Sequence, residues 1–533
     1  MAATPPHLRH TICFLSDFFF PNMGGVEMHI WYLSQCLIRL GHKVIVITHA
    51  YGRRQGIRYM TGGLKVYYLP LAVPYDQVIF PTLYAFFPLF RNILIREGVS
   101  LVHGHQSTSS LTNECILYAR TMGYPVCYTE HSLFGLDDAA SMLINKVLEV
   151  ILSDVDHVIC VSEACRRNLI LRTLIHPKYV SKITNAVDGS KFIPDPSKRY
   201  PRDTVNIVLL SRLVHRKGIA LLALVIPMIC DRFSHVHFII GGDGPLRVLL
   251  DRMCERHSLH HRVELLGTVA HSDVRDVLVR GHIFLNCSLT ESFCMALLEA
   301  ASCGLLVVST EVGGIPEVLP APMVILAKPE PAAVVEAIAC ALARTAAHGC
   351  TTANAHEMHQ SLRGLYSWPE IARQTERVYD AVAEMRKRDG PQRDYLTPRL
   401  ARYAAAGPLA GLIACFLAAS LYVLWCACEV CAPAAEIERC PPDLPWGSSV
   451  ELSAASSAGA GLGVGVGAGA GAGAGAGIWV GRREEVGNPK EYLESTLSVC
   501  VRNPNPTPVP SPNPSPSPHL CLRACGPSPA AHC

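Results

Sequence analysis

Residues 205–218 read VNIVLLSRLVHRKG, and this stretch decides the fold. Its first six residues are an apolar run of the kind that forms a buried strand, and a polar turn with Arg212 and Lys217 follows directly. Two cations at the carboxyl end of a strand are placed where a bound diphosphate would need countercharge. A solvated basic turn is the alternative, which this stretch alone leaves open.

The same rhythm of short apolar runs and longer helical patterns continues on both sides of this stretch. Strands are predicted at 11–15, 43–48, 101–103, 126–129, 157–161, 205–210, 237–240, 263–266, 283–286 and 306–309. Alternating strands and helices indicate an α/β fold with parallel sheets. The polar, proline-containing residues 196–204 are predicted to be a linker between two Rossmann-like domains, residues 1–195 and 205–385.

Two such domains are expected to face each other across a cleft, the usual place for a cofactor or substrate. Residues 330–385 are predicted to be helical and to pack back on the body. The chain carries a formal net charge of +3 and no basic block with interleaved aromatics, so nucleic-acid binding is not expected.

A membrane span is predicted at residues 407–428, GPLAGLIACFLAASLYVLWCAC, because they are uncharged and long enough to cross a bilayer. A buried helix of a soluble protein is the alternative. Basic residues precede the segment and acidic residues dominate after it, which places the preceding body in the cytosol. No signal peptide is expected at the start. Residues 433–533, with a Gly-Ala repeat and a Pro-Ser-Asn run, are expected to be a disordered low-complexity tail.

The 22 cysteines are scattered, and those before residue 400 form no CxxC pair or Cys/His zinc pattern. They are expected to be buried cytosolic thiols without metal. Cys426, Cys428 and Cys431 cluster at the end of the apolar segment, and palmitoylation is a modest alternative there.

Two glutamates eight residues apart form the next candidate site. Glu291 and Glu299 lie in LTESFCMALLEAASCG, residues 289–304. A helix is predicted to begin near Glu291, with Ser288 or Thr290 as its cap, which would place Glu299 about two turns further along. A carboxylate in so apolar a stretch needs partners, which sugar or ribose hydroxyls could supply. A structural salt bridge is the alternative.

Glycine pairs and one histidine complete the set. Gly24 and Gly25 follow the first strand at the mouth of a helix, where the backbone can approach an anion closely. Gly313 and Gly314 follow the strand after the glutamate pair and are expected to lie under a nucleotide. His131 follows a first-domain strand and is expected to face the same cleft, with a packing role as the alternative.

Taken in order, GGVE, EHS, NAVD, SRLVHRKG, GGDGP, E-x7-E and GGIPEV resemble the retaining glycosyltransferases of family 4, which have the GT-B fold. Segments such as FLSDFFFP (14–21), TEHSLFG (129–135), GHIFLN (281–286) and EAASCG (299–304) are similar to the catalytic subunits of phosphatidylinositol N-acetylglucosaminyltransferase. Thr184 stands where that family often has proline. The resemblance ends near residue 430.

The resemblance implies transfer of N-acetylglucosamine from UDP-N-acetylglucosamine to phosphatidylinositol, the first step of GPI-anchor biosynthesis. It also implies a single-pass protein of the endoplasmic reticulum membrane with a cytosolic catalytic body. Other subunits of the transferase complex would be its partners. No cofactor or metal would be needed, because cations take the metal's place.

The resemblance also assigns roles. Arg212 and Lys217 would hold the UDP diphosphate, Glu291 and His131 would contact the transferred sugar, and Glu299 would contact the ribose. Gly24 and Gly25 would lie near the diphosphate and the acceptor. The remaining substrate-binding candidates are Ser292, Phe293, Gly313 and Gly314. Two alternatives stay open: another GT-B enzyme with a different acceptor or reaction, and a non-catalytic variant of such a protein.

Overall fold

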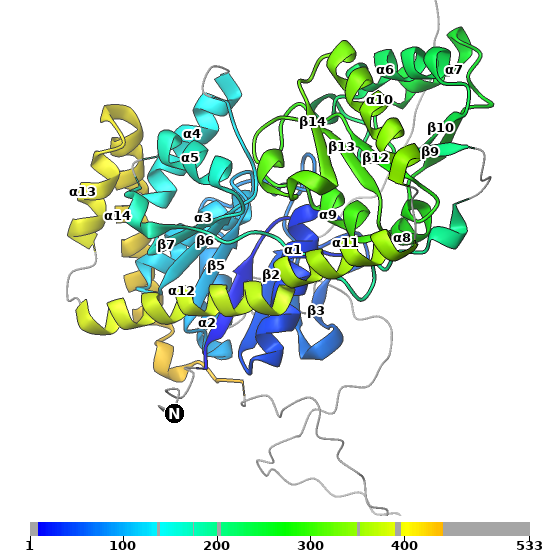
Figure 1. Cartoon of the computed structure of the whole chain (residues 1–533). Coiled ribbons are helices and arrows are strands. Elements are labelled where there is room, and N and C mark those ends of the chain that lie inside the picture. Colours follow the sequence, from blue (N-terminus) through cyan, green and yellow to red (C-terminus); the bar gives the residue numbers. More distant parts are fainter. Residues whose placement is uncertain are drawn as a thin grey trace, which may run out of the picture. The chain divides into compact units, whose positions relative to one another are not determined.

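The computed structural model describes residues 9–135, 139–173, 175–199, 204–348, 352–389 and 396–440 (Figure 1). All of these residues belong to one compact unit, residues 1–451. Two predominantly parallel β-sheets divide this unit into two lobes. Lobe 1 is built on the sheet of residues 11–182, and lobe 2 on the sheet of residues 205–327.

The sheet of lobe 1 has eight strands in the order β3-β4-β2-β1-β5-β6-β7-β8, with only the β3–β4 pair antiparallel. Its strands are β1 (Thr11–Leu15), β2 (Lys43–His49), β3 (Gly56–Tyr59), β4 (Lys65–Leu69), β5 (Leu101–His105), β6 (Val126–Glu130), β7 (His157–Cys160) and β8 (Val180–Lys182). Its helices are α1 (Gly25–Arg39), α2 (Phe87–Glu97), α3 (Ser110–Thr121), α4 (Ala139–Leu152) and α5 (Glu163–Arg172). The central strands are buried on both faces, as expected for a parallel sheet covered by helices.

The sheet of lobe 2 has six strands, all parallel, in the order β11-β10-β9-β12-β13-β14. They are β9 (Val205–Leu210), β10 (Val236–Gly241), β11 (Val263–Gly267), β12 (Ile283–Asn286), β13 (Leu306–Thr310) and β14 (Val324–Ala327). The helices are α6 (Ile219–Arg232), α7 (Arg247–Arg256), α8 (Val274–Leu278), α9 (Met295–Ser302), α10 (Pro331–His348) and α11 (Thr352–Leu365). Two Rossmann-like lobes confirm the predicted fold class.

All ten predicted strands are present, with ends that move by no more than two residues. Four strands were missed: β3, β4, β8 and β14. β3 is an exposed edge strand and β8 has only three residues, so neither has a strong apolar pattern. The predicted linker, 196–204, contains a short 3-10 turn at Pro196–Lys198, and residues 200–203 lie outside the described part.

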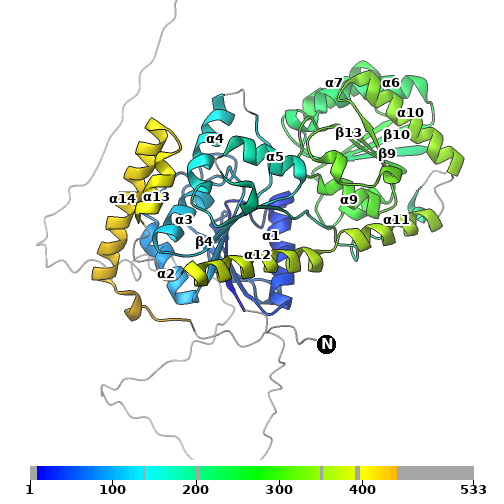
Figure 2. The same ribbon diagram turned by 60° about the vertical axis from the view of Figure 1, so that its left-hand side comes forward.

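Helix α12 (Trp368–Asp389) follows lobe 2 in sequence but packs on lobe 1 along α1 (Figure 2). Three polar contacts hold it there. Tyr379 shares a hydrogen bond of 2.6 Å with His103 Nδ1, Glu376 one of 2.9 Å with His42, and Asp380 one of 2.8 Å with His10. The predicted packing of residues 330–385 on the body is thus divided: α10 and α11 pack on lobe 2, against α6 and α9, and only α12 packs on lobe 1.

Helix α13 (Leu396–Ala404) is fastened to lobe 1 by a buried carboxylate. Asp154 accepts hydrogen bonds from Arg399 at 2.6 Å, from Arg402 at 2.5 Å and from Tyr403 at 2.9 Å. The neighbouring arginines lower the pKa of Asp154 despite its burial. Arg399 and Arg402 belong to the basic flank from which the membrane orientation was predicted, and both take part in this structural contact.

The predicted span corresponds to α14 (Pro408–Cys431), with a mean hydropathy of 2.2 over its most apolar window. It is the one helix in the described residues that is long and apolar enough to cross a membrane. Only 22% of that window is buried against the rest of the protein. The first residues of the predicted disordered tail, 433–440, are ordered: they contain a 3-10 turn at Ala434–Glu436, and the Cys440 amide donates a hydrogen bond of 2.7 Å to the carbonyl oxygen of Arg96. The prediction of disorder is therefore wrong for residues 433–440, and the rest of that prediction lies outside the described residues.

Candidate functional site

The turn after β9 places the two predicted cations at the carboxyl edge of the lobe 2 sheet. Arg212 is exposed and the Lys217 side chain is 20% exposed. Gly218 ends the turn with φ +69°, and a Cβ there would lie 1.8 Å from the carbonyl oxygen of Cys287. The turn therefore requires glycine at this position, because a side chain would collide with the backbone after β12.

Lys217 and Glu291 form an ion pair, so the structure brings two of the predicted catalytic residues into direct contact. Ser288 Oγ donates a hydrogen bond of 2.9 Å to the same carboxylate oxygen, Oε1. Among the described residues no hydrogen bond reaches the other oxygen, Oε2. Glu291 therefore keeps one acceptor for a ligand hydroxyl.

The prediction that a helix begins near Glu291 is wrong. Helix α9 begins at Met295, and Glu291 lies in the loop before it. The backbone of this loop is held from outside, because the carbonyl oxygen of Glu291 accepts a hydrogen bond of 2.9 Å from the amide of Gly314. Glu291 therefore does not lie two helical turns before Glu299.

Gly313 and Gly314 pack directly on that loop. A Cβ on Gly313 would lie 2.2 Å from the carbonyl oxygen of Glu291, and one on Gly314 would lie 2.0 Å from that of Ser292. Ser292 Oγ is buried without a hydrogen-bond partner among the described residues, while the Phe293 side chain is packed near Tyr366. The glycine pair thus supports the glutamate loop, and Ser292 offers a hydroxyl for a ligand.

Glu299 lies on α9, as predicted, and is partly buried. Burial raises the pKa of its carboxyl to about 7, and the charge of Lys191 partly offsets that rise. Tyr32 of α1 lies within electrostatic range of Glu299. A carboxylate with a raised pKa on the inner side of lobe 2 is suited to accept hydrogen bonds from hydroxyl groups.

On the lobe 1 side, Gly24 is the N-terminal cap of α1 and Gly25 is its first residue. Within the described part of the chain, no atom lies within 4 Å of a Cβ built on Gly25, so the space beside this glycine is open. Burial raises the pKa of Glu27, and the charge of Arg212 acts in the opposite direction. The charge of Arg212 in lobe 2 thus acts on Glu27 in lobe 1. We call the candidate residues of the two lobes, Gly24, Gly25, Glu27 and His131 of lobe 1 with Arg212, Lys217, Glu291, Ser292 and Glu299 of lobe 2, the interlobe site.

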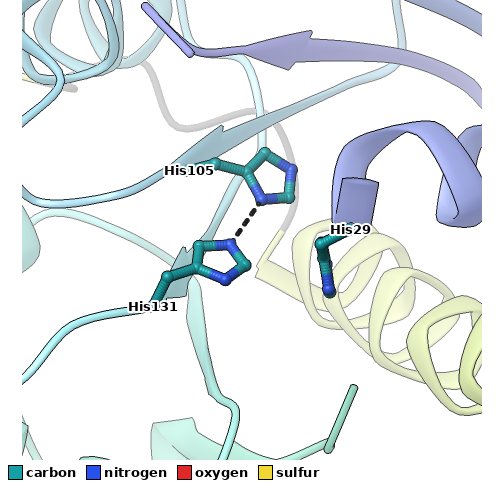
Figure 3. A group of neighbouring side chains, drawn as sticks. All are labelled: His29, His105 and His131. Atoms are coloured by element: carbon teal, nitrogen blue, oxygen red, sulfur yellow. Dashed lines mark hydrogen bonds between the residues drawn. The ribbon is translucent and has the colours of Figure 1, made fainter. Parts of the chain in front are cut away.

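His131 belongs to a group of three histidines at the ends of different elements (Figure 3). Its Nε2 shares a hydrogen bond of 3.2 Å with Nδ1 of His105, and its ring packs edge-on to that of His29 at 4.7 Å. Nδ1 of His29 donates to Oδ1 of Asn185 at 2.7 Å, so the buried Nε2 of His29 carries the lone pair. Burial lowers the pKa of His29 to about 4 and that of His131 well below its usual range. All three rings are therefore neutral at pH 7.

The same three histidines are the group in the described residues that could hold a metal, since their ligand atoms lie within 4.8 Å of one another. The group contains no carboxylate, and two of its nitrogens are already joined by the His105–His131 hydrogen bond. The expectation that the protein needs no metal stays a prediction.

The candidate site residues did not include His29, His105, Asn185 or Glu27, although Glu27 ends the GGVE motif and Asn185 begins the NAVD motif. Local signals also existed for the two histidines. His29 lies one turn after Gly25 on the same helix, and His105 comes at the end of a strand that was predicted to stop at His103. Nothing in the sequence indicated that Asn185 would reach His29, because the two are 156 residues apart.

The lobes also meet at Glu317, in the predicted GGIPEV motif. Its carboxylate oxygens accept hydrogen bonds of 2.8 Å from the amides of Glu163 and Ala164. These amides begin α5 of lobe 1, where a helix favours negative charge. The segment that contains Gly313, Gly314 and Glu317 therefore contacts lobe 1 directly.

Comparison with solved structures defines the class. Sucrose-phosphate synthase from Thermosynechococcus elongatus superposes with a TM-score of 0.60 at 20% identity, covering 71% of this chain and all of that one. Anabaena HepE in complex with UDP and glucose gives 0.55 at 16% identity, over 70% of this chain and all of that one. Residues 204–344 match the family described as glycosyl transferases group 1. The chain is thus a glycosyltransferase with the GT-B fold.

Relatives at higher identity narrow the class. Residues 49–138 match the family described as PIGA (GPI anchor biosynthesis). The chain is 51% identical over 439 residues to a phosphatidylinositol N-acetylglucosaminyltransferase subunit of Arabidopsis thaliana, covering 82% of this chain and 95% of that protein. It is 52% identical over 374 residues to the human protein of the same name, covering 70% and 76%. The chain belongs to the PIGA family of phosphatidylinositol N-acetylglucosaminyltransferase subunits.

Proposed function

We propose that the chain transfers N-acetylglucosamine from UDP-N-acetylglucosamine to phosphatidylinositol with retention of anomeric configuration, as one subunit of a membrane complex. The observation that carries this proposal is the assembly of Lys217, Glu291 and Arg212 beside the start of α1, in a chain of this family. The proposed site is the cytosolic face of the endoplasmic reticulum, to which α14 would anchor the protein.

The cations would act on the leaving UDP. Negative charge develops on the diphosphate as the glycosidic bond breaks, and cations already in place stabilise that charge without reorganisation. Lys217 carries three N–H donors, so it can keep Glu291 as a partner and still reach a phosphate oxygen. Arg212, with a planar fork of donors, would take a second phosphate oxygen. In this proposal no metal is required.

The acidic and neutral groups would position the donor. Glu291 Oε2 and the Ser292 hydroxyl would bind hydroxyls of the transferred sugar, while Glu299 would accept from the ribose. The neutral His131, oriented by His105, would contact the sugar from lobe 1. The open space beside Gly25 would admit the acceptor hydroxyl.

The test is transfer of labelled N-acetylglucosamine to phosphatidylinositol in membranes of cells that lack the endogenous protein and are supplied with this chain. We expect a labelled glycolipid whose linkage is α, like that of the donor. A β-linked product would contradict retention. Normal expression and assembly without any product would contradict the proposed acceptor or the activity itself.

A further inference from the structure

Residues 71–84, LAVPYDQVIFPTLY, form a loop between β4 and α2 that exposes apolar side chains while its backbone is held firmly. We call it the apolar loop. Tyr75 is 81% exposed, Leu83 72% and Phe80 63%. Large apolar side chains gathered on one exposed segment mark a surface that binds another apolar surface.

The backbone of the apolar loop is fixed by lobe 1. The amide of Phe80 donates to the carbonyl oxygen of Ala72 at 2.8 Å, which folds the loop back on itself. The amide of Ile79 donates to Oδ1 of the buried Asp17 at 3.2 Å, and that of Thr82 donates to Glu114 at 3.0 Å. The exposed side chains are therefore presented by an ordered segment.

The end and the middle of the apolar loop have different surroundings. At the end, the Tyr84 hydroxyl donates to the carbonyl oxygen of Leu417 and is 2.9 Å from Ser420 Oγ, both on α14. Around this contact α14 exposes apolar side chains: Leu409, Leu412, Ile413, Phe416 and Val423. Near the middle of the loop, the charge of Asp76 acts on Glu27, at the start of α1, and on Arg216, in the turn after β9.

We infer that the apolar loop is the track along which a diacyl phosphoinositide acceptor reaches the interlobe site from the bilayer around α14. Its acyl chains would lie against Phe80 and Leu83. The Arg216 guanidinium would attract the headgroup phosphate, and the Asp76 carboxylate would accept from inositol hydroxyls. The inference rests on the proposed function and adds its acceptor route.

Two further observations support this occupant. The loop lies within residues 49–138, the part of the chain that matches the GPI-anchor family rather than glycosyltransferases in general. The exposed apolar surface is also continuous with the candidate span, because Tyr84 joins the two directly. A lipid is the partner whose acyl chains match Phe80 and Leu83 and whose charged headgroup matches Asp76 and Arg216.

The test compares two acceptors in the assembled complex: long-chain phosphatidylinositol in vesicles, and glycerophosphoinositol, which has the same headgroup without acyl chains. The variant is Phe80→Ser with Leu83→Ser, and the control is Leu171→Ser, an equally exposed leucine (74%) on α5. We expect the KM for phosphatidylinositol to rise about tenfold in the variant, because two apolar contacts are lost, with no change for glycerophosphoinositol. The control should match the parent.

Unchanged kinetics with phosphatidylinositol, or equal losses with both acceptors, would overturn the inference. A photoreactive benzoylphenylalanine at position 83 gives a second measurement that does not depend on turnover. It should crosslink to phosphatidylinositol, whereas one at Leu224, 59% exposed on α6, should not. Crosslinking at position 83 to another protein of the complex instead would identify a protein surface and overturn the lipid track. A parent active on neither acceptor would refute the proposed function, while lipid crosslinking would still report on the loop.

Discussion

The two lobes share a Rossmann-like fold, but different contacts hold the loops around the interlobe site in each lobe. In lobe 2 the loops are held by close backbone packing, since Gly218, Gly313 and Gly314 each lie against a carbonyl oxygen with no room for a side chain. In lobe 1 the loops are held by buried polar side chains, such as Asp17, which fixes the apolar loop, and the histidines around His131. Lobe 2 matches glycosyltransferases in general, whereas residues 49–138 of lobe 1 match the GPI-anchor family. We propose that the donor binds mainly to lobe 2 and that lobe 1 contributes the surface that selects the acceptor.

The largest expected effect is on the donor side. Lys217→Ala should lower the rate of transfer by about 10²–10³-fold with any acceptor, because the charge on the leaving diphosphate loses a preorganised cation. Stability should change by less than about 1 kcal/mol, since the Lys217–Glu291 pair is partly exposed. The transfer rate is measured in membranes, and the stability is measured by thermal unfolding of the purified complex. Lys328→Ala, an exposed lysine of the same lobe, is the control. Loss of folded protein in Lys217→Ala would make this lysine structural.

A matched pair of glycines tests whether close backbone packing in lobe 2 excludes a side chain at Gly218. Gly218 and Gly98 have similar positive φ angles, +69° and +62°, but only Gly218 has an obstructing atom. Gly98→Ala should cost about 1 kcal/mol for the left-handed conformation alone. Gly218→Ala should cost more than about 3 kcal/mol, because the new Cβ overlaps the Cys287 carbonyl oxygen. Denaturant unfolding of both variants measures this difference in the free energy of unfolding. Equal losses in the two variants would mean that the turn after β9 can move to accept the new Cβ.

The smallest expected effect is on pH dependence. Since the pKa of Glu299 is about 7, the carboxylate is progressively lost below that pH, and the KM for UDP-N-acetylglucosamine should rise several-fold by pH 6. Glu299→Gln should have a raised KM that no longer varies over this range. A parent and variant with the same pH profile would remove Glu299 from donor binding.

Ionisation of Glu299 should favour donor binding but lower the free energy of unfolding. The folded pKa of Glu299 is raised above its ordinary value of 4.5, so its contribution to stability is complete below pH 4.5 and is lost as pH rises through 7. Glu299→Gln should therefore be more stable than the parent at pH 8, by about 1–3 kcal/mol. Unfolding at pH 5 and pH 8 is the measurement, and a variant that is less stable at pH 8 would contradict it.

The contrast between the lobes also explains what the sequence could predict. Buried parallel strands are short apolar runs, so ten strands, the two Rossmann-like halves and the long apolar helix α14 could be located from the local sequence pattern. Arg212 and Lys217 could be placed in a turn after a strand, and Glu299 on a helix, because both patterns are local. The start of α9 could not, because the loop at Glu291 is held by Gly314, 23 residues later.

The sequence did not reveal the long-range contacts that hold α12 and α13 on lobe 1. The contacts of Asp154 with Arg399 and Tyr403, and of His103 with Tyr379, join residues more than 200 positions apart. No local periodicity reports such contacts. The apolar loop was also missed, since its exposed phenylalanine and leucine look like core residues in sequence.

The proposal that the donor binds to lobe 2 is tested most directly by measuring the affinity of the intact complex for UDP. Arg212→Ala in lobe 2 should weaken UDP binding at least about tenfold, because a charge-assisted contact to the diphosphate is lost. Leu83→Ser in lobe 1 should bind UDP as the parent does. Parental UDP affinity in Arg212→Ala, or an equal loss in both variants, would contradict the assignment of the donor to lobe 2.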